Sequence, residues 1–162
     1  MKFLSNFQIL NKRNQLLIKK FKAKFLAEDI RVNNPASITE IDEFENKYQI
    51  KLPLILREYF LLFNGTGQGN FGKDGFAFFS LSEFKLASEE LSDNAPDKNF
   101  YPNCFVFSDY LVWCWGYAIK LNSDGIDGEI FQVTGSSHPP RLIAKSFTEF
   151  IELFLINSDH LI

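Results

Sequence analysis

The spacing of apolar residues in this chain changes once in the middle, at Asn64-Gly65, and this change constrains the fold more than any motif does. Before it, from residue 36 to 63, apolar side chains recur three and four residues apart, as on the buried face of a helix. After it, the apolar segments are short, as in strands, until a last helical pattern near the C-terminus. Helices followed by turn-connected strands and a closing helix indicate an α+β fold with a twisted antiparallel sheet.

Two helices are predicted before this change. Ser37 and Glu40 form a capping box at the start of the first helix. Its apolar stripe consists of Ile41, Phe44 and Tyr48. Pro53 suits the first turn of the second helix, and Asn64-Gly65 is typical of a left-handed C-terminal stop.

A literal G-x-G-x-x-G follows this stop, at Gly67, Gly69 and Gly72. Nucleotide binding requires a strand before such glycines and a helix after them, because the amides at the helix N-terminus hold the phosphates. Here a helix comes before the glycines, and the apolar segment 75–81, a predicted strand, comes after them. Lys73 is followed by Asp74, so the P-loop pair is missing as well. We therefore predict a flexible connection and no cofactor.

The sheet is predicted to contain four or more strands, flanked by N-terminal helices and a C-terminal helix. The predicted strands are 75–81, 104–108, 110–121 and 129–133, and a short helix is possible within the acidic stretch 82–99. In 110–121 the alternation places Trp113 and Trp115 on one face, which favours a core position over an exposed binding ladder. The closing helix begins at a second capping box, Ser146 and Glu149.

Residues 1–30 are predicted to form a basic amphipathic helix. Leu17, Phe21 and Phe25 recur at helical spacing, which favours packing on the chain's own domain over a membrane-surface or partner helix. Residues 1–25 carry seven basic side chains and no acidic one, which leaves 10 basic and 20 acidic side chains, a balance of −10, for residues 26–162. An acidic body discourages nucleic-acid binding and favours basic partners, although it also fits ordinary solubility.

Few residues suggest chemistry. His138 and His160 lie outside any nucleophile or metal motif, and Cys104 and Cys114 stand apart from any zinc spacing. Asp124, Asp127 and Glu129 fit a hairpin turn better than a calcium loop. No apolar run reaches the roughly 20 residues that span a bilayer, so we expect a cytoplasmic, single-domain protein of residues 1–162 with no membrane span and no metal.

The ordered elements resemble the SUKH superfamily of Smi/Knr-like regulators of yeast cell-wall assembly and bacterial immunity proteins. The resemblance rests on "ASITEIDEFENKYQIKLPLILREYFLLFNG", "FVFSDYLVWCWGYAIKL", "DGEIFQV" and "IAKSFTEFIELFL", and it covers about residues 36–156. It implies one α+β domain without an agreed enzymatic activity. The positions that match the family pattern, and that we interpret as structural, are Leu52, Pro53, Asn64, Gly65, Ser146 and Phe147.

The resemblance implies a non-catalytic protein-binding domain, most concretely an immunity protein that neutralises a cognate bacterial toxin, such as a nuclease, by direct binding. The alternatives are an interaction or scaffold module in another pathway and an enzyme of unrecognised type. The partner expected from the acidic body is a basic toxin domain. We expect the contacts to be acidic residues near loops that are exposed to solvent, namely Glu89, Glu90, Asp93, Asp97, Asp124 and Asp127.

Overall fold

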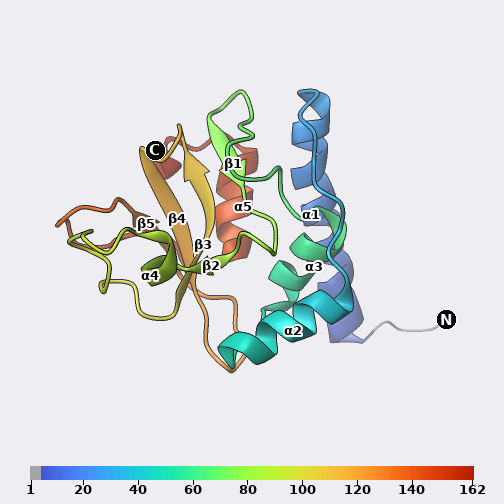
Figure 1. Cartoon of the computed structure of the whole chain (residues 1–162). Coiled ribbons are helices and arrows are strands. Elements are labelled where there is room, and N and C mark those ends of the chain that lie inside the picture. The colour runs from blue at the N-terminus through green and yellow to red at the C-terminus, as the bar shows by residue number, and fades with distance from the viewer. Residues whose placement is uncertain (1–4) are drawn as a thin grey trace.

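The computed structural model describes residues 5–162, which form an antiparallel sheet with helices packed against it (Figure 1). The helices are α1 (Asn6–Ala27), α2 (Ile38–Tyr48), α3 (Leu54–Leu62), the one-turn α4 (Ala87–Glu90), α5 (Phe147–Leu155) and a final 3-10 turn (Asp159–Leu161). The strands are β1 (Phe76–Phe78), β2 (Lys85–Leu86), β3 (Cys104–Tyr110), β4 (Trp115–Lys120), β5 (Ile130–Val133) and β6 (Arg141–Ala144). The predicted α+β class is confirmed.

The sheet has the order β1-β3-β4-β5-β6, and within residues 5–162 all strand pairs are antiparallel. The short strands β1 and β2 share one edge of β3, because β1 pairs with residues 108–110 and β2 with residues 105–106. The predicted hairpin across residues 121–129 is confirmed as β4 and β5. The edge strand β6 was not predicted, because its four residues follow a Pro-Pro pair and only two of them are buried.

Apolar side chains are buried on both faces of the sheet. The larger cluster lies between the sheet and helices α1, α2, α3 and α5, and it is built mainly from phenylalanine. Phe21 of α1 illustrates its density, since its ring lies within 6.1 Å of five other aromatic rings. The smaller cluster, on the other face, contains Phe79, Ala87, Tyr101, Cys104, Val106, Ala118 and Val133. Figure 1 shows α4 and the chain after it on the opposite side of the sheet from α1 and α3.

The second half of α1 packs on the domain as predicted, with Ile18, Phe21 and Phe25 almost fully buried. Leu17 is only partly buried at the edge of the same cluster. The helix starts at a capping box formed by Ser5 and Gln8, which was not predicted. Residues 1–4, at the beginning of the predicted segment 1–30, lie outside the described residues.

The prediction that 110–121 is one strand was wrong. Strand β3 continues to Tyr110, and residues 111–114 form the turn that leads into β4. Leu111, Val112 and Trp113 adopt φ values of 44°, 56° and 63°, which apolar residues rarely adopt, so composition gave no sign of a turn. As a result the two tryptophans lie apart: Trp113 packs against the smaller cluster, and Trp115 stacks on Tyr110 at 4.6 Å in the larger one.

The predicted helix boundaries are largely confirmed. The Ser37–Glu40 capping box is present, and Asn64 and Gly65, which follow the C-cap Phe63 of α3, adopt φ values of 55° and 74°. The side chain of Ser146 accepts a hydrogen bond from Glu149 N at 3.0 Å, as an N-cap should. The second capping box is only half formed, however, because the Glu149 carboxylate accepts from Lys145 N and not from Ser146 N.

The order helix, glycine loop, strand is confirmed, and hydrogen bonds to other segments hold the loop that we predicted to be a flexible connection. Thr66 N and Gly67 N both donate to the carbonyl oxygen of Phe78 at 2.9 Å. Gln68 N donates to Glu83 Oε1 at 2.9 Å, and Lys73 N donates to Glu28 Oε2 at 2.7 Å. Two amides that could face a phosphate are therefore already bonded to carboxylates of this chain, which supports the prediction that the loop holds no nucleotide.

Candidate partner-binding surface

The six acidic residues that we expected to contact a partner lie in two separate places. Glu89, Glu90, Asp93 and Asp97 lie in or just after α4, on the side of the smaller cluster. Asp124 and Asp127 lie in the β4–β5 loop, where Lys51 N donates to the carbonyl oxygen of Asn122 and joins this loop to the α2–α3 link. The six residues therefore do not form one patch.

Three of the six are exposed, namely Glu89, Asp93 and Asp124. Glu89 accepts a hydrogen bond from Tyr48 Oη at 2.8 Å, and Asp93 pairs with Lys98. Asp124 accepts from the amide of Ile126 inside its own turn at 3.0 Å. Each of these carboxylates stays accessible to a partner while the protein holds it in position.

The expectation of exposure was wrong for Asp97, which is fully buried and accepts from Gly135 N at 3.0 Å. Asp127 is half-buried and caps α5, because its carboxylate accepts from Phe147 N at 2.7 Å and from Thr148 N at 3.1 Å. Glu90 is mostly buried and pairs with Lys85 at 2.8 Å. Asp97 and Asp127 therefore hold the loops that carry them, and Glu90 holds the end of α4 to β2.

The positions that match the family pattern make internal contacts. Leu52 N donates to Glu45 Oε1 at 2.9 Å, and Pro53 is the residue before α3. Asn64 fastens two segments, since its Oδ1 accepts from Leu81 N at 2.9 Å and its Nδ2 donates to Asn34 O at 2.7 Å. Phe147, the first residue of α5, is fully buried.

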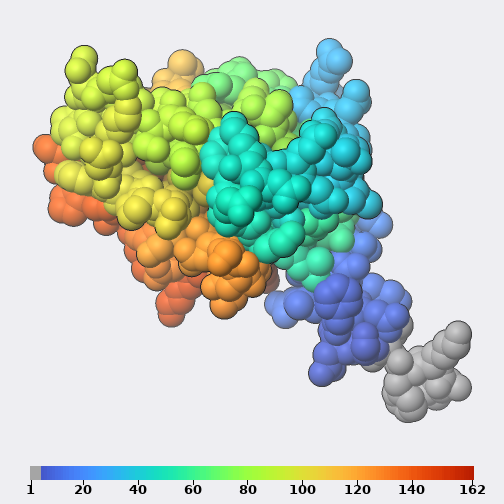
Figure 2. Space-filling model, turned by 60° about the horizontal axis from the view of Figure 1, so that its bottom comes forward, coloured from blue at the N-terminus to red at the C-terminus, as the bar shows by residue number. Residues whose placement is uncertain are grey.

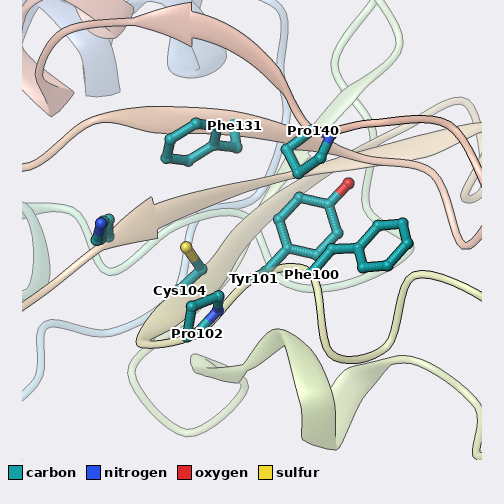
Figure 3. Close-up of a pocket in the computed structure, with 7 residues that line it drawn as sticks. Phe100, Tyr101, Pro102, Cys104, Phe131 and Pro140 are labelled. Atoms are coloured by element: carbon teal, nitrogen blue, oxygen red, sulfur yellow. The ribbon is translucent and has the colours of Figure 1, made fainter.

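A pocket of about 170 Å³ opens beside the smaller cluster, on the same face of the sheet as α4 (Figure 3). Its walls are mostly apolar or aromatic: Phe100, Tyr101, Pro102, Cys104, Phe131 and Pro140. The Tyr101 hydroxyl donates to the carbonyl oxygen of Gln132 at 3.0 Å and so holds the 91–103 segment against β5. Phe100 is 44% exposed at the rim, and Lys120 contributes a charged group to the lining.

The acidic stretch around α4 lies on the same face of the sheet as the pocket, because Ala87 of α4 belongs to the smaller cluster together with Tyr101 and Cys104 of the pocket wall. Leu91, the residue after α4, packs against the smaller cluster together with Phe131. Asp93 follows two residues later and is exposed. We call the pocket together with the exposed residues Glu89 and Asp93 the α4 surface. An apolar centre with charged groups at its edge is the usual arrangement of a protein-binding surface.

The sequence did not predict this pocket, although a signal existed. Phe100-Tyr101-Pro102 and Pro139-Pro140 are apolar residues in loops. Buried residues of a loop do not recur at a regular spacing, so helical or strand periodicity does not reveal them. Only the folded chain brings the two loops together over β4 and β5.

The cysteine in the pocket is poorly suited to nucleophilic chemistry. Cys104 is 2% exposed, and burial raises the pKa of its thiol to about 11. The thiol is therefore protonated at neutral pH, whereas a reactive cysteine needs a lowered pKa. Within residues 5–162, no group of three or more His, Cys, Asp or Glu side chains is placed to hold a metal ion.

The buried carboxyl group of Asp109, in β3, makes the stability of the protein depend on pH. Its side chain is 1% exposed and its Oδ1 atom has no hydrogen-bond partner, and burial raises its pKa from 3.8 to about 6. Because the folded protein binds this proton more tightly, the contribution of Asp109 to stability falls as pH rises from about 4 to about 6.

Asp109→Asn removes this ionisable group. The substitution should therefore be more stabilising at pH 7 than at pH 4, and the two changes in the free energy of unfolding should differ by about 2 kcal/mol. Denaturant unfolding at both pH values measures the difference. Equal effects of the substitution at pH 4 and pH 7 would contradict the raised pKa.

An α+β domain with an apolar pocket beside exposed carboxylates has the features of a protein-binding domain. The model of the SMI1 / KNR4 family (SUKH-1) matches residues 35–153. The chain belongs to this family, and the resemblance predicted for residues 36–156 is confirmed. No curated protein matches the sequence. None of the helices within residues 5–162 has both the length and the apolar character that crossing a bilayer requires.

Proposed function

We propose that this protein is an immunity protein that binds a basic toxin domain through the α4 surface and neutralises it by occlusion. The observation that carries the proposal is the apolar pocket beside exposed carboxylates, on the sheet face opposite the larger core. Membership of the SMI1 / KNR4 family (SUKH-1) supports a role in binding a protein partner. An interaction module of a regulatory pathway is the alternative use of the same surface.

The pocket supplies the centre of the proposed contact. Affinity in protein complexes is concentrated in a few aromatic side chains that fill or line desolvated pockets. Phe100 is well placed for this role, because it lines the pocket while 44% of its surface remains accessible. Its neighbour Tyr101 is fixed by the hydrogen bond to Gln132, so the pocket is formed before a partner arrives.

The exposed carboxylates of the α4 surface would speed association with a basic partner and orient it. Residues 26–162 carry an excess of ten acidic side chains, and Glu89 and Asp93 place part of that charge at the α4 surface. Charges at the edge of a contact act mainly on the association rate, and salt screens them because the Debye length falls from about 10 Å at 0.1 M to about 3 Å at 1 M.

The test is to measure binding of the full chain to the toxin domain encoded beside its gene, at several salt concentrations. Phe100→Ala should weaken affinity about tenfold or more, mainly through faster dissociation. Glu89→Gln/Asp93→Asn should slow association and reduce its salt dependence. Phe7→Ala and Glu43→Gln/Asp124→Asn are matched controls, since they change exposed residues of the same types elsewhere.

Two results would contradict the proposal. If the control variants weaken binding as much as the α4-surface variants, the contact lies elsewhere on the protein. If no complex forms and cells that express the toxin are not rescued, the protein is not an immunity protein for that toxin. Stable capture of several other proteins through Phe100 would then favour the regulatory interaction module.

A further inference from the structure

Helix α1 has a second face that the domain does not use. Asn14, Ile18, Phe21 and Phe25 face inward and are buried. On the opposite side Ile9 and Leu16, seven residues apart, form one exposed line, because seven residues are close to two helical turns. Both side chains are large and apolar, with 54% and 57% of their surface exposed. We call this side of the helix the outer face of α1.

Basic side chains flank this apolar line on both sides. Lys12 and Lys19 lie along one edge, and Arg13 and Lys20 lie along the other, and all four are exposed. Helix α1 contains no acidic residue. The outer face therefore combines a narrow apolar line with a strong positive charge, within a chain whose net charge is −3.

Three of these charges are free within the described part of the chain. Lys12, Lys19 and Lys20 are in no ion pair among residues 5–162, whereas Arg13 approaches Glu152 at 3.6 Å. The other lysines of the helix turn back to the body, since Lys22 donates to the carbonyl oxygen of Leu62 at 3.1 Å and Lys24 pairs with Asp74 at 2.8 Å. The free ammonium groups are those that point away from the body.

The first turns of α1 also extend beyond the body. Figure 2 shows the N-terminal part of the helix projecting from the rest of the molecule. Phe7 and Leu10 lie on the same side of the helix as its buried residues, but in this projecting part they are 65% and 48% exposed. Here both sides of the helix present large apolar side chains to solvent.

We infer that the outer face of α1 binds the surface of a bilayer rich in anionic phospholipids, with the helix lying in the headgroup region. Apolar side chains flanked by lysines are the features that hold a helix at such an interface, because the lysine stems bury their methylenes while the ammonium groups reach the phosphates. The helix lies at the outer edge of the molecule (Figure 1), so it presents a convex ridge, which fits a flat surface better than it fits a peptide. The acidic α4 surface belongs to the opposite side of the sheet and remains available to a protein partner.

The full chain should sediment with vesicles made of equal amounts of phosphatidylglycerol and phosphatidylcholine, and not with vesicles of phosphatidylcholine alone. Each basic residue near an anionic surface strengthens binding about fivefold, so Lys12→Gln/Lys19→Gln should weaken partitioning about 25-fold. Lys47→Gln/Lys145→Gln lowers the net charge equally at exposed positions outside α1, and it should leave partitioning nearly unchanged. Ile9→Ser/Leu16→Ser should also release the protein while every variant keeps its melting temperature, since the substituted side chains are exposed.

Several results would overturn the inference. The first is failure of the wild-type chain to sediment with the anionic vesicles. The second is equal weakening by the α1 double variant and its control, because net charge alone would then explain the binding. The third is binding of a polyglutamate peptide without vesicle binding, which would assign the outer face of α1 to an acidic protein partner.

Discussion

Gly65→Val should destabilise the protein by about 4 kcal/mol and lower its melting temperature by about 10 °C or more. Gly65 follows helix α3 with φ +74°, a conformation that a β-branched residue adopts only under strain. A Cβ at this position would lie 2.3 Å from Phe78 O and 2.8 Å from Phe79 O. Both are backbone atoms, so neither can move aside without disturbing β1 and the residue after it.

Gly69→Val is the matched control. Gly69 has a similar φ of +80°, but a Cβ there would meet nothing within 4 Å. This variant should therefore lose only the conformational part of the effect, about 1–2 kcal/mol. Thermal and urea unfolding of both variants separate the two contributions. Similar losses at the two positions would show that close packing around Gly65 contributes nothing.

Phe21→Ala should cost about 4 kcal/mol, because it leaves a cavity in the densest part of the larger cluster. The Phe21 side chain is fully buried, and its ring contacts Phe25, Tyr59, Phe63, Phe78 and Phe154 at centroid distances of 4.7–6.1 Å. The residue lies outside the matched range 35–153. A large loss of stability would show that α1 is part of the folding unit.

Phe7→Ala in the same helix provides the comparison, since Phe7 is 65% exposed and should change the free energy of unfolding by no more than about 0.5 kcal/mol. Urea unfolding with a constant m-value is the appropriate measurement. If Phe21→Ala also unfolds with nearly wild-type stability, α1 is an attached segment that the core does not need.

Local signals in the sequence were sufficient for most of the helices. Ser37 and Glu40, Pro53, Gly65 and Ser146 specify where helices begin or end through the atoms of one turn, and the structure places those boundaries as expected. The same locality explains why the glycine loop could be predicted not to bind a nucleotide. The order of helix and strand around it could be predicted without knowing what the loop contacts.

The hairpin at residues 111–114 and strand β6 could not be predicted in this way. Three consecutive left-handed apolar residues contradict every local turn preference, and they are held by the pairing of β3 with β4 and by the packing of Trp113 on the smaller cluster. Strand β6 exists because β5 offers an open edge, not because Arg141–Ala144 has a strong strand pattern. These features depend on contacts between segments distant in sequence.

For the candidate site, the sequence by itself determined the charges and the family pattern, and the tertiary structure decided which of them can be used. Asp97 and Asp127 are equivalent to Asp93 and Asp124 in composition, yet the fold turns the first two inward to hold Gly135 N and the start of α5. Burial and hydrogen bonding of a side chain depend on the segments packed over it, which no local pattern encodes. For that reason the pocket formed by the loops around Phe100 and Pro140, and the unused outer face of α1, emerge only from the folded chain.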